Sequence, residues 1–174
     1  DFYIAHLSQC DSRAHLEYVR RYREDILRSI EWAHSQNDDE RVMELVFLVG
    51  KALGDLGYWN HQLAWGRRAV EASQRLGNSE RAIWHTVCNV AWVHIYRGEY
   101  TPAERLTREG LEMAEELNYP RLQAIAHQNL GIIAFEQGGY KTAEEEFKKG
   151  LEIAQAQDMT QWVARFQSFL GRLK

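Results

Sequence analysis

The sequence predicts an all-α fold in which antiparallel helical hairpins stack on one another as an α-solenoid. Long segments carry apolar residues three and four positions apart, which is the spacing of one helix face. Only two prolines interrupt the 174 residues, and no stretch alternates polar and apolar residues over the length of a strand. A pattern of small residues also returns about every 40 positions, as expected when similar hairpins stack.

The repeat is centred on a small residue within the first helix of each hairpin. Equivalent positions hold Val49-Gly50, Val90-Ala91, Leu130-Gly131 and Leu170-Gly171. A small residue lets the second helix of the hairpin lie close to the first. We therefore expect each of these positions, Gly171 included, to be closely packed against a neighbouring helix.

The turn inside each hairpin also repeats. Glycines are expected to end the first helices in a left-handed conformation at Gly57, Gly98 and Gly138. Aromatic residues then cover the turns at Trp59, Tyr100 and Tyr140. The stretch Thr101-Pro102-Ala103-Glu104 predicts a capping box, in which Thr101 is the N-cap of the following helix and Glu104 bonds back to it.

The elements follow in this order along the chain. An N-terminal helical segment (1–37), which is either separate or a degenerate repeat, precedes a solenoid over 38–174. The solenoid comprises repeats at about 42–78, 79–118 and 120–158 and a terminal helix at 160–174. No second helix follows it. Either the array was cut there, which leaves a face that can pair with another copy, or this helix covers the apolar flank of the third repeat as a cap.

Composition disfavours several classes of function. A net charge of −4 and a pI of about 6.0 provide no basic surface for nucleic acid or an anionic membrane. The longest apolar run is too short to cross a bilayer, and the two cysteines, Cys10 and Cys88, do not suggest a disulfide framework. The chain begins at Asp1 without a visible signal peptide, which predicts an excised cytoplasmic fragment. No cofactor is predicted.

The segment around Leu130-Gly131 resembles the tetratricopeptide repeat family. Tyr140, Ala143, Phe147 and Gly150 complete the match, although the period exceeds the usual period of about 34 residues by about six. The middle repeat departs with Ala91, His94 and Thr107, and the first with Gln62. The longer period is similar to that of kinesin light chains and of Leu-Gly-Asn-repeat polarity adaptors. The resemblance implies a noncatalytic domain that binds a protein or peptide in a concave groove lined by the first helices.

The residues expected to line this groove are counted from the small-residue pair in each repeat. They are Phe47, Lys51, His85, Asn89, Trp92, Tyr96, Gln128, Asn129, Ile132, Glu136, Arg165 and Arg172. The resemblance implies that Asn89 and Asn129, at one repeat position, clamp the main chain of a ligand. The alternative is that each amide ties adjacent helices together. Phe47, Trp92 and Tyr96 either anchor a partner or belong to the core.

Residues 15–33 resemble a helix of the STAND class of signalling ATPases, where it joins a winged-helix region to the repeats. Asp25, Ile26, Ile30 and Glu31-Trp32-Ala33 carry the match. The resemblance implies a sensor or regulatory region, and the ATPase module would lie outside this chain because no P-loop motif occurs in it. The alternative is a generic adaptor scaffold with no ATPase attached.

A Cys/His-dependent enzyme is a further alternative. His85 and Cys88 are three residues apart, so they would lie on one helix face as a thiolate–imidazole pair. No third group at a recognisable spacing orients them, and we predict neither a catalytic nor a metal site. The acidic and basic run at 144–149 is expected to be a solvated helix face with Glu144–Lys148 and Glu145–Lys149 pairs.

Overall fold

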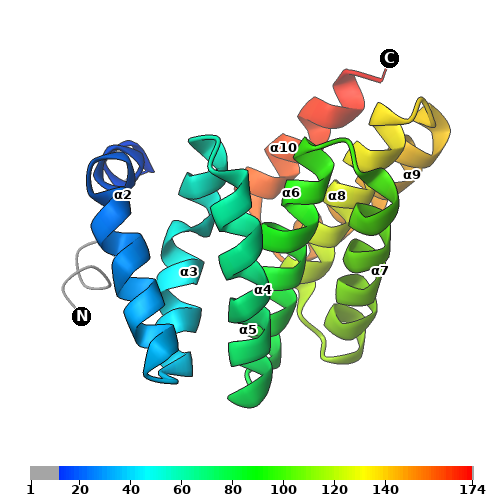
Figure 1. The fold of residues 1–174 in the computed structure, drawn as a ribbon. Helices are drawn as coiled ribbons and strands as arrows, with labels where there is room; N and C mark the ends of the chain where they lie inside the picture. Colours follow the sequence, from blue (N-terminus) through cyan, green and yellow to red (C-terminus); the bar gives the residue numbers. More distant parts are fainter. Residues whose placement is uncertain (1–11, 174) are drawn as a thin grey trace. The chain divides into compact units, whose positions relative to one another are not determined.

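Figure 1 shows a computed structural model of the chain, which describes residues 12–173. The described residues form helices joined by short turns and contain no strand. The all-α class predicted from the sequence is therefore confirmed for this part of the chain. None of its helices is long and apolar enough to span a membrane.

The helices follow one another with few residues between them. They are α2 (Ser12–Ser35), α3 (Asp39–Asp55), α4 (Trp59–Arg75), α5 (Ser79–Trp84), α6 (Trp92–Tyr96), α7 (Tyr100–Glu116), α8 (Pro120–Glu136), α9 (Tyr140–Ala156) and α10 (Thr160–Gly171). A π-helix, η1 (His85–Ala91), lies between α5 and α6. Helix α2 is kinked at Tyr22, whose φ of −108° and ψ of 17° are not helical.

The helix bounds repeat with the period of the sequence. Helices begin at Asp39, Ser79, Pro120 and Thr160, at successive spacings of 40 or 41 residues. We call the helices that begin there A helices (α3, the α5–η1–α6 segment, α8 and α10). The helices that follow them, α4, α7 and α9, are called B helices.

Left-handed residues end both kinds of helix. Gly57, Gly98 and Gly138 have φ of 82°, 70° and 79°, which confirms that they end the A helices in this conformation. The B helices end in the same way, at Gly77, Asn118 and Asp158, and α2 does so at Asn37. Asparagine and aspartate tolerate positive φ better than other side chains, so this second series was visible in the sequence but was not recognised there.

Side-chain caps begin two of the A helices. The carboxylate of Asp38 accepts a hydrogen bond from the Arg41 backbone N at 3.0 Å, and the Asn78 side chain accepts one from Arg81 N at 3.1 Å. The predicted capping box at Thr101 is wrong. Helix α7 already begins at Tyr100, with Glu99 as an N-cap whose side chain makes no capping bond. Thr101 is therefore inside the helix, where its hydroxyl cannot cap.

The described residues form two compact units that divide between His85 and Thr86. In unit 1, α2 packs on α3, α3 on α4 and α4 on α5. A single apolar core joins α2, α3 and α4, and it includes Val19, Ile30, Val49, Leu53 and Trp65. The N-terminal helix thus shares its core with the first hairpin.

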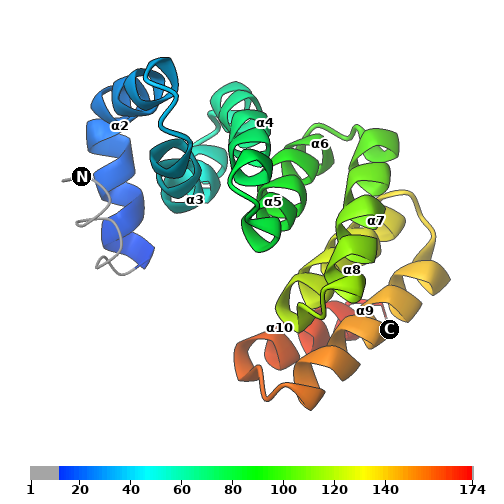
Figure 2. The ribbon, with the colours of Figure 1, turned by 90° about the horizontal axis from the view of Figure 1, so that it is seen from below.

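In unit 2 the helices lie in two layers. Both ribbon views place α6, α8 and α10 in one layer and α7 and α9 in the other (Figures 1 and 2). Two apolar clusters lie within the unit. One contains Ile95, Ala103 and Ile133, and the other is built around Phe147 and Phe166.

Two glycines of unit 2 receive aromatic rings from neighbouring helices. A Cβ added at Gly131 would lie 2.3 Å from Cε1 of Phe147, and one added at Gly150 would lie 2.3 Å from Cζ of Phe166. The close packing predicted at Gly131 is thus confirmed. The same prediction is wrong for Gly171, which is exposed and has no atom within 4 Å of the corresponding point. None of the helices described covers this side of α10.

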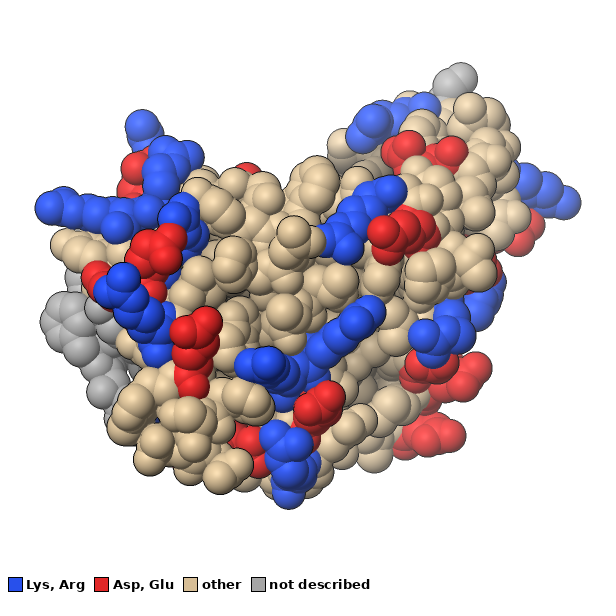
Figure 3. All heavy atoms as spheres, viewed as in Figure 1, with Lys and Arg blue, Asp and Glu red and all other residues tan. Residues whose placement is uncertain are grey.

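Charged side chains of both signs are interspersed over the face drawn in Figure 3. Many pair within one helix, as Glu104 does with Arg108, Arg105 with Glu109 and Glu144 with Lys148. The last of these confirms one of the two predicted pairs in the 144–149 run. Such exposed pairs each contribute at most about 0.5 kcal/mol.

The glycine contact predicts a position-specific loss of stability. Replacing Gly131 with Val should lower the free energy of unfolding by about 1–3 kcal/mol, because the buried Phe147 ring would have to move. The equivalent change at Gly171, where there is open space, should stay within about 0.5 kcal/mol of the wild type. Urea unfolding of both variants measures the difference, and equal losses would contradict the packing described here.

Candidate functional site

The predicted groove residues of unit 1 are engaged within that unit. The Arg81 guanidinium lies 3.3 Å from the centroid of the Phe47 ring and also bonds to Glu44 at 3.2 Å. Lys51 forms an ion pair with Asp55. His85 is fully buried. Phe47 and His85 therefore contribute mainly to the structure of unit 1, whereas Lys51 remains exposed beside Asp55.

His85 and Cys88 are both in unreactive states at neutral pH. The pKa of His85 is lowered to about 3, mainly by burial and in part by the charge of Arg81, although a backbone hydrogen bond with Met43 opposes the shift. Burial raises the pKa of the Cys88 thiol to about 12 despite the charge of Arg121. A neutral imidazole and a protonated thiol do not make the activated pair of a cysteine enzyme. Among the described residues, no group of three or more His, Cys, Asp or Glu could hold a metal ion.

Asn129 makes a hydrogen bond inside unit 2. Its side chain is 1% exposed, and its Nδ2 donates to the backbone oxygen of Val87 at 3.0 Å. Val87 lies in η1, and a side chain that bonds to a helix carbonyl in this way is a known cause of local departure from α-helical geometry. This bond favours the interhelical tie over the ligand clamp for Asn129. Asn89, at the equivalent position, is also buried.

A hollow of about 130 Å³ lies between α8, α9 and α10 and brings together three predicted groove residues. They are Ile132, Glu136 and Arg172, and the remaining lining residues are Phe135, Phe147 and Phe169. The Phe147 and Phe169 rings stack with centroids 4.8 Å apart and an interplanar angle of 8°. We call this cavity the α8–α10 hollow.

The two charged residues of the α8–α10 hollow lack ionic partners within the described part of the chain. Glu136 and Arg172 are both exposed, and neither side chain has a hydrogen bond or ion pair there. The Arg172 guanidinium lies 5.9 Å from the centroid of the Phe135 ring, within the range of a cation–π contact. The hollow thus combines an aromatic lining with one acid and one base that can bind other groups.

Other predicted residues extend the face around this hollow. Gln128 precedes Ile132 by one turn of α8; it is 4% exposed, and its Oε1 has no hydrogen-bond partner in the described structure. Trp92 and Ile132 pack against the same apolar cluster. The Trp92 and Tyr96 rings meet edge to face, 5.3 Å apart. We define the α6–α8–α10 face by the residues Trp92, Tyr96, Gln128, Ile132, Glu136 and Arg172. Arg165, which was also predicted to line the groove, is not included, because its guanidinium lies over the Trp162 ring.

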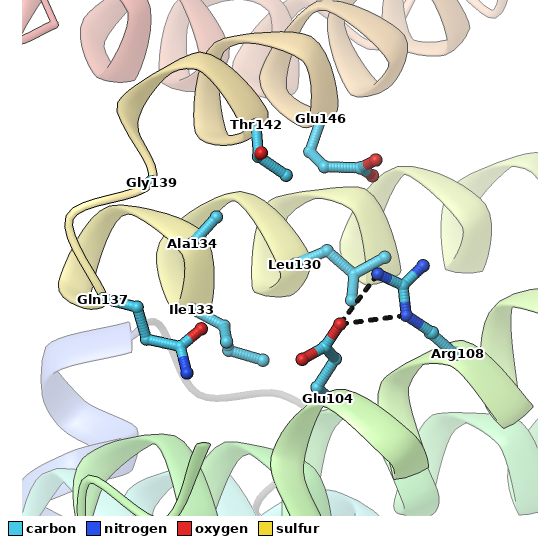
Figure 4. Close-up of a pocket in the computed structure, with 9 residues that line it drawn as sticks. All are labelled: Glu104, Arg108, Leu130, Ile133, Ala134, Gln137, Gly139, Thr142 and Glu146. Carbon is cyan, nitrogen blue, oxygen red and sulfur yellow. Dashed lines mark hydrogen bonds and ion pairs between the residues drawn. The ribbon is translucent and has the colours of Figure 1, made fainter. Parts of the chain in front are cut away.

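A second hollow, of about 160 Å³, lies among α7, α8 and α9 (Figure 4). Its carboxylates already have partners. Glu104 accepts hydrogen bonds from Arg108 at 2.8 and 3.1 Å (Figure 4). Glu146 bonds to His127 Nδ1 and to Lys149 Nζ, each at 2.8 Å. Because its charges are neutralised from within the fold, this hollow is a weaker candidate than the α8–α10 hollow.

Glu146 corrects the prediction for the 144–149 run. Lys149 pairs with Glu146 and not with Glu145, and Glu146 is only 8% exposed, so this position is not on a solvated face. The hydrogen bond from His127 and the contacts with Lys149 lower the pKa of Glu146 to about 2. His127, which comes from α8, could not be matched to this carboxylate by spacing within α9.

Sequence reasoning did not assign the aromatic lining of the α8–α10 hollow to a site. Phe147 was interpreted as a packing residue of the repeat, and Phe135 and Phe169 were not singled out. One signal was available: Phe169 occupies the repeat position that holds Asn89 and Asn129 in the preceding A helices. An aromatic residue at a position that holds a buried amide in the preceding A helices indicates that this side chain has another role in α10.

Comparison with known proteins does not add to this description. A scan against protein-family models and a search of the curated proteins both find no match.

The buried His85 predicts that stability falls on mild acidification. Below pH 6.5 the unfolded chain binds a proton at this imidazole, whereas the folded chain does so only near pH 3. The free energy of unfolding should therefore decrease by up to about 1.4 kcal/mol per pH unit as the pH falls from 6.5 to 5. Urea unfolding across this range measures the slope.

Two variants, His85→Gln and Glu146→Gln, distinguish the contributions of these two buried groups to the pH dependence. His85→Gln should flatten the slope between pH 6.5 and 5. Glu146→Gln should leave it unchanged, because the stability that comes from the depressed pKa of Glu146 is lost only once the pH drops below about 4.5. A slope that persists in His85→Gln would show that another group causes it.

The raised pKa of Cys88 predicts an unreactive thiol. In a Cys10→Ser background, Cys88 should be alkylated by iodoacetamide at pH 8 about a hundredfold more slowly than glutathione, because little thiolate is present. Unfolding in guanidinium should restore the rate of an ordinary thiol. Alkylation of the folded protein as fast as glutathione would revive the Cys/His enzyme hypothesis.

Proposed function

We propose that this chain is a noncatalytic recognition scaffold that binds a segment of a protein or peptide on the α6–α8–α10 face. The observation that carries the proposal is the convergence of Ile132, Glu136 and Arg172 on one aromatic-lined hollow. An apolar hollow with a few convergent polar groups is a common form of binding site. The two charged groups have no ionic partners in the described part of the chain, so they are available to a ligand.

The proposal includes an α-solenoid of the tetratricopeptide type with long repeats. It is supported by A helices that begin at a period of 40 or 41 residues and by left-handed residues at equivalent ends of the helices. In unit 2, the seating of Phe147 on Gly131 and of Phe166 on Gly150 is the packing expected between neighbouring helices of such a stack. Stacked hairpins leave their A helices side by side along one surface, where a partner segment can lie.

The protonation states and partners of His85, Cys88 and Glu146 fit a noncatalytic scaffold better than an enzyme. The imidazole of His85 and the thiol of Cys88 are held in their neutral forms. The buried Glu146 is paired with His127 and Lys149. Strongly shifted groups can mark active sites, but each of these is explained by burial or by an internal partner.

Attachment to a STAND-class ATPase, a cytoplasmic location and self-association through α10 remain predictions. The residues that resemble the STAND helix lie on α2, and Ile26, Ile30 and Ala33 are buried in the core of unit 1. Packing is sufficient to explain these three. The proposal is therefore limited to the adaptor or sensor role that both hypotheses share, which is binding to another polypeptide.

Selection from a random peptide library displayed on phage tests this proposal. Peptides enriched on the wild-type chain should lose about tenfold or more in affinity for Ile132→Ala, because truncation removes an apolar contact of the hollow. Met113→Ala is the matched control, since Met113 is an exposed apolar residue of the B helix α7. It should change affinity by less than about twofold.

Fluorescence anisotropy measures these affinities, and thermal unfolding checks that each variant is folded. Two outcomes would refute the proposal. One is a library that yields no specific peptide, and the other is peptides whose binding is equally insensitive to both substitutions.

A further inference from the structure

We propose that the α8–α10 hollow holds one apolar side chain of the partner, between a basic and an acidic residue of the same segment. The basic residue pairs with Glu136 and the acidic residue with Arg172. This inference rests on the proposed function and specifies the ligand of that site. Three features of the site support it, namely the size of the hollow, its two unpaired charges and Gln128.

The size and lining of the hollow favour an apolar side chain at the central residue of the partner segment. A volume of about 130 Å³ suits a single side chain of the partner rather than the apolar stripe of a whole helix. Its aromatic and aliphatic walls come from Ile132, Phe135, Phe147 and Phe169. A leucine, methionine or phenylalanine side chain would remove these surfaces from water, and the release of that water drives binding.

The charges of Glu136 and Arg172 favour a basic and an acidic residue on either side of the apolar residue of the partner. Elsewhere in unit 2, exposed charges such as those of Arg105 and Arg108 are neutralised by a carboxylate one turn away. Glu136 ends α8 and Arg172 follows the last residue of α10; both line the hollow, and neither has such a partner in the described residues. A ligand with complementary charges would gain specificity from both of them.

Gln128 favours a peptide over a small molecule. Its Oε1 is buried and without a hydrogen-bond partner in the described structure, one helical turn from Ile132. A helical turn rises about 5.4 Å, so a ligand that reaches both residues must extend beyond the hollow. Because this oxygen is covered, the Gln128 side chain would have to turn outward to accept a backbone N–H of an extended segment, and the cost of an unpaired buried acceptor favours that bond.

Charge reversal tests the inference on peptides selected from the random library. On the wild-type chain, we expect enrichment of an apolar residue flanked by a base on one side and an acid on the other, in one fixed order. Glu136→Lys and Arg172→Glu should each weaken the selected peptides by about threefold to tenfold. The double variant should enrich the opposite order and should bind a synthetic peptide whose two charges are exchanged.

A matched control uses the exposed ion pair of α7. The double reversal Arg105→Glu with Glu109→Lys exchanges the same kinds of charge outside the hollow, and it should leave the selected sequences and their affinities unchanged. Thermal unfolding confirms that all variants are folded. Titration with free leucine and free phenylalanine, followed by NMR, forms a further arm.

The outcomes separate this inference from the function on which it rests. Peptides that depend on Ile132 but are indifferent to Glu136 and Arg172 would overturn the inference and leave the proposed function standing. Saturable binding of a free amino acid at the hollow would also overturn it, in favour of a small-molecule site. Failure to select any peptide would overturn both.

Discussion

The contact between aromatic rings and glycines is the interaction on which the organisation of unit 2 depends. Phe147 of α9 seats on Gly131 of α8, and Phe166 of α10 seats on Gly150 of α9. Each glycine allows a ring to reach the neighbouring backbone, so three successive helices are held at close range. The Phe147 ring also stacks on Phe169 and lines the α8–α10 hollow. The same packing that builds the core therefore shapes the candidate site.

The polar side chains of unit 2 include buried groups that the fold uses and exposed groups that it leaves available. Asn129 satisfies the Val87 carbonyl, and Glu146 is held by His127 and Lys149. Leaving such groups unpaired would cost about 1–3 kcal/mol each, so these residues are committed to structure. Glu136 and Arg172 are not committed in this way within the described chain. The proposed recognition uses these groups, which stability does not require.

Equivalent positions of the repeat have acquired different uses. The position that holds buried amides at Asn89 and Asn129 holds Phe169 in α10, where the ring becomes part of the hollow. The position that receives an aromatic ring at Gly131 is open at Gly171. A repeat thus fixes the backbone geometry while allowing the side chains of one helix to depart from the pattern.

The sequence by itself determined the helical class, the period and the conformation of Gly57, Gly98 and Gly138. These features depend on local rules, namely the spacing of apolar residues along a helix and the steric cost of positive φ. It also placed Ile132, Glu136 and Arg172 on one predicted face. Only the tertiary structure decided that Asn129 bonds to Val87, that Lys149 pairs with Glu146, and that Phe147 and Phe169 enclose the hollow. The first and last of these join separate helices, and the Lys149–Glu146 pair depends on the seating of Glu146 against His127 of α8. Helical spacing fixes which residues share a face but not which side chains meet across it.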